Sequence, residues 1–122
     1  MVERAVILQK LDVGDVFHAE SPNGASLICL VTRVDESTIY ARTVTTQYSL
    51  RFDRTTGEAE WGGGGAPCII DSVAPLPVEI CNVILGIDRK YRLEQDVDKL
   101  KLNDAEKRAL VFVDSYYSQN QL

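Results

Sequence analysis

The chain has 122 residues, 45% of them hydrophobic, and a formal net charge of −5, values that suit one globular domain with an ordinary core. No hydrophobic run approaches the roughly 18 residues of a membrane-spanning helix, so no membrane partner is expected. The excess of acidic residues disfavours non-specific binding to nucleic acid, which needs a basic surface, and would suit a basic protein partner.

Cysteine usage and the N-terminus indicate a cytoplasmic protein. The three cysteines, Cys29, Cys68 and Cys81, are odd in number and irregularly spaced, which argues against a disulfide framework. Each lies among apolar residues, as expected of small buried side chains in a reducing compartment. A bridge between Cys29 and Cys68 remains an alternative. The hydrophobic stretch at residues 5–8 is too short for a signal peptide, and no cleavage site follows it.

The first part of the chain predicts a β-hairpin. Residues 2–10 fit either an edge strand or a short helix, because their apolar run is too short to show a period. Residues 16–20 and 26–34 have the character of strands, and the Ser-Pro-Asn-Gly sequence at 21–24 is a strong turn. Both faces of 26–34 are largely apolar. This strand should therefore be covered on both sides, by the barrel interior and by a C-terminal helix.

Further strands and a glycine-rich loop complete an antiparallel meander. Residues 38–45 and 48–52 are predicted strands, and the second alternates apolar and polar residues, so one of its faces should be exposed. After residues 58–61, four glycines at 62–65 indicate a flexible hairpin loop. The glycines are followed neither by the lysine of a phosphate-binding loop nor by a helix, and residues 66–73 predict a closing strand.

Two helices are expected after the strands. Pro77 suits the first turn of a helix, and apolar residues at helical spacing continue to Tyr91. Asn103 and Glu106 form a capping-box pattern for a second helix, which should run to about Tyr117. The predicted apolar stripe of this helix consists of Ala109, Phe112, Val113 and Tyr116, with Leu110 and Tyr117 at its margin.

These elements predict a mainly β, α+β fold in a single domain, residues 1–122. The strand and turn spacing of residues 11–73 resembles the small SH3-like and Sm-like barrels, although no sequence motif specifies either of them. We therefore expect five or six antiparallel strands in a small barrel, with residues 77–118 packed on it as two C-terminal helices. The resemblance is architectural and implies nothing about function.

No arrangement of catalytic, metal-binding or cofactor-binding residues stands out, so we predict neither enzyme activity nor a cofactor. His18 is the only histidine, which argues against a zinc site. A nucleophilic Cys29 would need His18 as its activating base across the first hairpin, and nothing in the sequence places the two side chains face to face. The acidic residues of the strand region lie in or beside turns, where aspartate has a local structural reason to occur.

Aromatic and basic side chains provide the main candidate binding surface, which consists of Tyr40, Arg42, Tyr48 and Arg51. Arg42 and Arg51 would lie side by side if their strands pair, and small barrels hold single-stranded nucleic acid with such stacking and charge. The simpler interpretation is a solvated face on which these arginines, with Arg33 and Arg54, form ion pairs. The acids available for those pairs are Asp35, Glu36, Asp53, Glu58 and Glu60.

We predict a non-catalytic, intracellular protein-binding or adaptor module that binds another protein or its own copy. Trp61 and the pair Tyr116 and Tyr117 are its candidate anchors, because aromatic residues are enriched at interfaces. One alternative is a small barrel that binds single-stranded nucleic acid through the tyrosines and arginines of its strands. A second alternative is an acidic inhibitor of the phage or antitoxin type, which would present carboxylates to a nucleic-acid enzyme.

Overall fold

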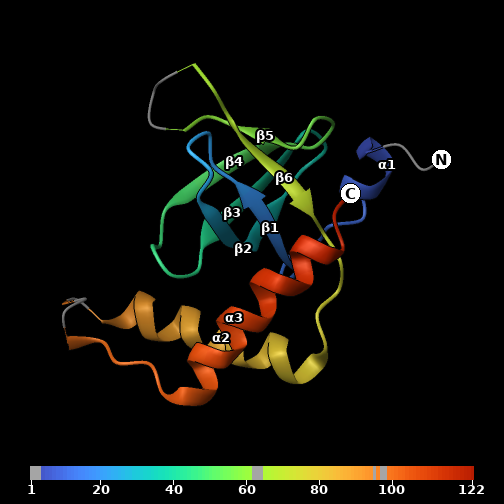
Figure 1. Cartoon of the computed structure of the whole chain (residues 1–122). Helices are drawn as coiled ribbons and strands as arrows, with labels where there is room; N and C mark the ends of the chain where they lie inside the picture. The colour runs from blue at the N-terminus through green and yellow to red at the C-terminus, as the bar shows by residue number, and fades with distance from the viewer. Residues whose placement is uncertain (1–3, 62–64, 95, 97–98) are drawn as a thin grey trace.

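A computed structural model describes residues 4–61, 65–94, 96 and 99–122. Figure 1 shows a strongly curved sheet that lies above two long helices. The helices are α1 (Arg4–Leu8), α2 (Val78–Leu93) and α3 (Asp104–Gln119). The strands are β1 (Val16–Glu20), β2 (Ser26–Val34), β3 (Thr38–Thr43), β4 (Ser49–Asp53), β5 (Glu58–Ala59) and β6 (Cys68–Ser72).

The strands form one antiparallel sheet in the order β4-β3-β2-β1-β6-β5. β4 and β5 are consecutive in the chain, yet they occupy the two edges of the sheet. The sheet curls until these edges approach each other in a nearly closed barrel. This architecture confirms the predicted small antiparallel barrel followed by two C-terminal helices. The predicted first hairpin is also confirmed, since β1 pairs with β2 from Val16 opposite Leu30 to Glu20 opposite Ser26.

Two hydrophobic clusters lie on opposite faces of β1 and β2. The inner cluster fills the barrel, where the rings of Phe17 and Phe52 meet edge to face with their centroids 5.3 Å apart. The outer cluster joins Val16 and Leu30 to buried side chains of α2 and α3. Full burial of each large side chain stabilises the fold by about 1.5–3 kcal/mol. The two-sided burial predicted for residues 26–34 is therefore present, and it attaches the helices to the barrel.

The N-terminal segment forms a helix and not an edge strand. Leu8 of α1 is fully buried and belongs to the inner cluster, together with Leu11 in the loop that follows. The Arg4 Nη1 atom donates a hydrogen bond of 2.5 Å to the Ile70 carbonyl oxygen of β6. β5 already pairs with β6 at that edge of the sheet, so α1 does not extend the sheet. Through Leu8, α1 instead packs on the inner cluster and closes one end of the barrel.

The capping box predicted for the last helix is confirmed. The Asn103 side chain accepts a hydrogen bond of 2.8 Å from the Glu106 backbone N–H, and Glu106 Oε1 accepts one of 2.9 Å from the Asn103 backbone N–H. Lys90 Nζ of α2 lies 2.6 Å from the same Glu106 oxygen. Hydrogen bonds from Lys90 and Asn103 hold the pKa of the Glu106 carboxyl below its usual value. One carboxylate thus begins α3 and ties it to α2.

The buried stripe of α3 differs from the predicted one. Its centre is formed by Ala109, Val113 and Tyr117, which follow one another at four-residue intervals. Tyr117 is only 1% exposed. Its hydroxyl donates a hydrogen bond of 3.0 Å to the Val16 carbonyl oxygen, which satisfies both buried polar groups. Phe112, predicted to be buried, lies to one side of this stripe and is 41% exposed.

The glycine loop predicted at residues 62–65 falls mostly outside the described residues, because only Gly65 is among them. Within the described part of the chain, each helix is too short or too polar to cross a lipid bilayer.

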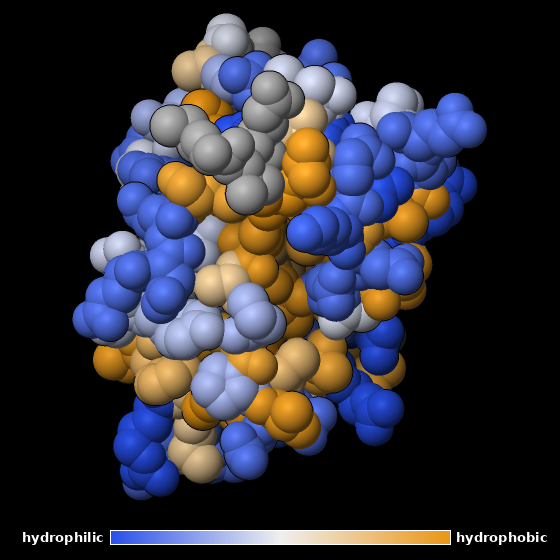
Figure 2. Space-filling model, turned by 90° about the vertical axis from the view of Figure 1, so that its right-hand side faces the viewer, coloured by the Kyte–Doolittle hydropathy of each residue, from blue (hydrophilic) through white to orange (hydrophobic). Residues whose placement is uncertain are grey.

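Hydrophobic side chains gather in a band on the face seen from the right of Figure 1, as Figure 2 shows. On this side the loop after α1 and the linker before α2 enclose a hollow of about 220 Å³. Its walls are mainly apolar and include Leu11, Val73, Leu76 and Cys81.

Gly57, in the turn between β4 and β5, should tolerate a side chain least well among the glycines with positive φ. Its φ is +77°, and an added Cβ would lie 3.2 Å from Arg4 Nη1 and 3.3 Å from Leu8 Cδ1. Gly14 is a matched control, since its φ is +91° and an added Cβ would meet nothing within 4 Å. We expect Gly14→Ala to lower the free energy of unfolding by about 1 kcal/mol through backbone strain alone. Gly57→Ala should cost more in the same urea titration, and equal losses would contradict the close packing of α1 on this turn.

Candidate binding groove at the barrel seam

The two edges of the sheet meet along a seam, which we define as the junction between β4 and β5. Neither strand forms ladder hydrogen bonds with the other. A turn joins them at one end, where the Asp53 carboxylate accepts hydrogen bonds from the backbone N–H groups of Thr55 and Thr56. The hydrogen bonds from Thr56 and Thr55 hold the pKa of Asp53 below its usual value. At the other end, the rings of Tyr48 and Trp61 meet edge to face at 6.1 Å. The seam is thus held at its two ends and not along its length.

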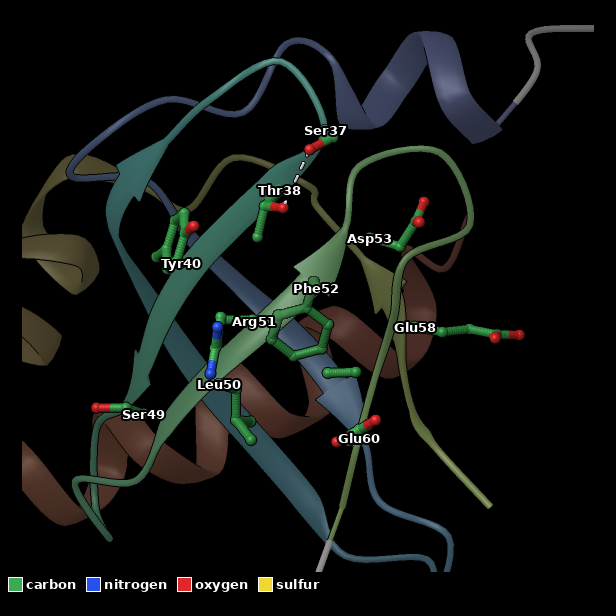
Figure 3. Close-up of a pocket in the computed structure, with 11 residues that line it drawn as sticks. Ser37, Thr38, Tyr40, Ser49, Leu50, Arg51, Phe52, Asp53, Glu58 and Glu60 are labelled. Carbon is green, nitrogen blue, oxygen red and sulfur yellow. Dashed lines mark hydrogen bonds between the residues drawn. The ribbon is translucent and has the colours of Figure 1, made fainter. Parts of the chain in front are cut away.

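A hollow of about 620 Å³ lies along this seam (Figure 3). Its walls come from β3, β4 and the segment of β5. Figure 3 shows Tyr40 and Arg51 on one side of the hollow and Asp53, Glu58 and Glu60 on the other. We call this hollow the seam groove. It has the concave shape and the convergent polar side chains of a binding site.

The pleat of β4 separates its side chains into core and groove sets. Leu50 and Phe52 are buried in the inner cluster, whereas Ser49, Arg51 and Asp53 are exposed on the outside. The predicted division of this strand into an apolar and a wet face is therefore confirmed. It places a polar side chain on each alternate residue along the groove, and two of these, Arg51 and Asp53, are charged.

Arg51 has no ion-pair partner among the described residues. The strand register places Arg51 directly opposite Tyr40, and the Arg33 guanidinium lies 4.0 Å from the centre of the Tyr40 ring. None of the ion pairs formed within the described chain involves Arg51, Glu58 or Glu60. A free guanidinium therefore faces free carboxylates across the groove, and both remain available to a ligand.

Arg42 has a structural role and does not lie directly beside Arg51. Its strand partner is Ser49, and its guanidinium reaches α2, where Nε and Nη2 donate to the two Asp88 carboxylate oxygens at 3.0 and 2.8 Å. Gln47 Nε2 donates a third hydrogen bond to Asp88 at 2.9 Å. Burial alone would raise the pKa of Asp88, but the hydrogen bonds from Arg42 and Gln47 and the nearby positive charges hold it below its usual value. This bidentate pair fastens α2 to the barrel.

The remaining arginines of the predicted set are also engaged within the fold. Arg54 donates hydrogen bonds to the carbonyl oxygens of Asp35, Gln9 and Leu11, so it ties the β4–β5 turn to two loops. The ion pairs expected between these arginines and the acids of the strand region do not form within the described residues. Arg42 instead uses Asp88, which lies 46 residues away in the sequence. No local sequence pattern connects Arg42 with a partner so far along the chain.

The predicted aromatic anchors have different positions. Tyr48 is 57% exposed and Trp61 is half-buried, and both border the seam. Tyr117 lies in the core and presents no surface to a partner, which corrects its expected exposure. Tyr116 is half-buried at the far side of the molecule, where its hydroxyl donates a hydrogen bond of 2.6 Å to the Pro75 carbonyl oxygen. The structure therefore places Tyr40 and Arg51 in the groove lining, and Tyr48 and Trp61 next in the chain to the lining residues Ser49 and Glu60. Arg42 lies near Tyr40 and Arg51 but is held by Asp88, and Tyr116 and Tyr117 lie on α3.

His18 and Cys29 lie on opposite faces of the first hairpin. Cys29 is opposite Phe17 and points into the barrel, whereas His18 is opposite Ile28 on the face that α3 covers. Burial raises the pKa of the Cys29 thiol far above its usual value, which opposes thiolate formation. His18 Nδ1 instead lies 2.5 Å from Asp71 Oδ1 of β6. The activated-cysteine arrangement considered from the sequence is therefore wrong.

The cysteines also leave the alternative disulfide unformed. All three thiols are free, with Cys29 and Cys68 buried and Cys81 half-buried. Within the described residues, no group of three or more histidine, cysteine, aspartate or glutamate side chains is placed to hold a metal ion.

Comparisons with known proteins give no further guide to the groove. No family model, curated protein or solved structure matches the chain significantly. Its function is therefore argued from its own residues.

The Arg42–Asp88 pair should make the stability of the protein depend on pH. Because Asp88 has a lowered pKa in the folded state, its ion pair stabilises the fold at neutral pH and is lost as pH falls through that value, below about 4. Arg42→Ala should cost about 3 kcal/mol at about pH 7, since it leaves a buried carboxylate with little compensation. Asp88→Asn should cost less, because its amide oxygen still accepts a hydrogen bond.

Urea unfolding at about pH 7 and about pH 3 measures this effect. The stability gap between the native chain and Asp88→Asn should narrow at the lower pH, because the lowered pKa of Asp88 makes the native chain lose stability once the pH falls below the unfolded-state pKa of about 4. A gap of equal size at both values would show that Asp88 is not an ionised partner of Arg42.

The two tyrosines at the end of α3 should differ in their contribution to stability. Tyr117→Phe removes the hydroxyl that donates to the buried Val16 carbonyl oxygen. It should lower the free energy of unfolding by about 1–3 kcal/mol. Tyr116→Phe removes a hydrogen bond at an exposed site, so water can replace the lost group at little cost. Thermal and urea unfolding of the two variants check this order, which a larger loss in Tyr116→Phe would contradict.

Proposed function

We propose that the chain is a non-catalytic protein-binding module and that the seam groove is its binding surface. One observation carries this proposal. The edges of the sheet meet without ladder hydrogen bonds at the place where a 620 Å³ hollow displays charged side chains that the fold does not use. Charged groups left unpaired around a concavity favour a binding role over a structural one.

The composition of the groove favours a protein partner. Arg51 and Tyr40 on one wall and Glu58 and Glu60 on the other offer both signs of charge within one hollow. Tyr48 and Trp61 add aromatic surface at its end, and tyrosine, tryptophan and arginine are the residues most enriched at protein interfaces. A standard interface covers about 800 Å² on each partner, so the groove would form the centre of a larger contact.

This surface fits single-stranded nucleic acid less well than it fits a protein partner. Of the four residues proposed for that role, Arg42 is held by Asp88, and one face of Tyr40 is occupied by Arg33. Only Arg51 is left to meet a phosphate, and three carboxylates stand across the groove from it. Binding of this kind would also require several uncommitted cations along one face.

The acidic wall of the groove favours one second candidate, the inhibitor of the phage or antitoxin type. Asp53, Glu58 and Glu60 line the groove, and Asp35 and Glu36 precede it in the adjoining turn. Hydrogen bonds from the Ser37 and Thr38 backbone lower the pKa of Asp35, so this carboxylate stays ionised. Such a surface suits a basic partner, including the nucleic-acid-binding face of an enzyme.

A cytoplasmic location is part of the same proposal. Its support is the state of the three thiols, which are free and mostly buried, as in proteins of reducing compartments. A partner would then be another cytoplasmic protein.

Site-directed photo-crosslinking tests the groove as a binding surface. A photo-reactive amino acid in place of Ser49, which is exposed on the groove wall, should capture a defined protein in cells that express the chain. The same residue in place of Asp114, which is exposed on α3, is the matched control and should not capture it. The captured protein is then purified and titrated against the native chain.

The titration can be followed by the fluorescence of Trp61, the only tryptophan, which follows the groove residue Glu60 in the chain and contacts Tyr48. Glu58→Lys with Glu60→Lys should weaken binding at least about tenfold, equivalent to about 1.4 kcal/mol. The proposal fails if both crosslinker positions capture the same proteins, or if the purified protein binds the double variant as tightly as the native chain. Single-stranded RNA that displaces it through Arg51 would instead favour the nucleic-acid alternative.

A further inference from the structure

A second charged surface, opposite in sign to the groove, lies at the junction of the two long helices. The last turn of α2 and the chain before α3 surround a hollow of about 410 Å³ whose basic side chains are Arg89, Lys90, Lys99 and Lys101. Lys90 pairs with Glu106, but no ion pair within the described chain engages the other three. We call this surface the basic end. Leu93, 70% exposed, gives it an apolar centre.

Charge is unevenly distributed between the two ends of the molecule. Residues 1–88 contain twelve acidic and six basic residues, a net charge of −6. Residues 89–108 contain five acidic and seven basic residues, a net charge of +2. The basic end therefore belongs to a part of the chain with an excess of positive charge, although Glu94 also lines its hollow.

The two surfaces cannot meet within one molecule. Figure 1 places the junction of α2 and α3 at the end of the molecule away from β4 and β5. The seam groove with Glu58 and Glu60 and the basic end with Lys99 and Lys101 therefore point to different neighbours. Complementary surfaces at different ends of one chain allow a second copy to satisfy both.

We propose that the seam groove of one copy binds the basic end of another copy of this chain. This inference rests on the groove as a binding surface and names its occupant. Glu58 and Glu60 face Lys99 and Lys101 of the second copy, and Leu93 of that copy enters the groove. Because the contact joins unlike surfaces, it leaves one free groove and one free basic end on each pair and allows further copies to add.

The contact is electrostatic and therefore sensitive to salt. A single exposed ion pair contributes little, so several pairs must act together to hold two copies. Raising the salt concentration from about 25 mM to about 300 mM shortens the range of these interactions severalfold. Light scattering on the full chain should therefore show a mass that rises with protein concentration at low salt and returns to the monomer at high salt.

Charge reversal gives the decisive test. Glu58→Lys with Glu60→Lys makes the groove basic, and Lys99→Glu with Lys101→Glu makes the other end acidic, so each double variant alone should remain monomeric at low salt. An equimolar mixture of the two should associate again, because each surface then meets one of opposite charge. All four side chains are exposed, so the substitutions should leave the fold intact. Circular dichroism confirms folding before the comparison.

A matched control separates this contact from general charge effects. Glu20→Lys with Asp114→Lys raises the net charge by the same amount as the groove variant, at exposed positions outside both surfaces, and should associate like the native chain. A native chain that stays monomeric at low salt, or variants whose mixture stays monomeric, overturns the inference. Neither result touches the binding of a foreign protein to the groove, which the crosslinking experiment decides separately.

Discussion

Burial of both faces of β1 and β2 is the constraint on which the rest of the structure depends. One face of this hairpin supplies the barrel interior with Phe17 and Cys29, and the other receives α2 and α3 on Val16 and Leu30. This sheet hides one face by curling around the inner cluster and the other beneath the two helices. The position of every remaining element follows from this division.

The seam is the consequence of closing a small barrel from six strands of unequal length. β5 has only two residues, and it lies beside the five residues of β4 without ladder hydrogen bonds. A turn at one end and the Tyr48–Trp61 contact at the other hold these edges together. The open stretch between these points exposes side chains that would otherwise lie on a continuous sheet, and this is why the groove forms there.

The arginines show how tertiary contacts engage most of a set of similar residues and leave one of them available. Arg33, Arg42, Arg51 and Arg54 all come from neighbouring strands, but three of them bind a ring, a carboxylate or backbone carbonyl groups of the fold. Arg51 alone is left facing carboxylates that are equally free. At the junction of α2 and α3, Lys90 pairs with Glu106. The neighbouring Arg89, Lys99 and Lys101 form no ion pair within the described residues. The charges available at the surface therefore depend on which side chains the fold leaves unpaired, and not on how many are present.

Local patterns in the sequence determined most of the architecture. The first hairpin, the capping box of Asn103 and Glu106, and the two-sided burial of β2 all depend on residues close together in the chain, so their signals could be recognised. Closure of the barrel decided the rest. The partner of Arg42 lies on α2, and Tyr117 reaches Val16 across 101 residues. The acids expected to pair with the strand arginines form no ion pair within the described residues. Such contacts depend on distances between elements, which periodicity and spacing along the chain do not specify.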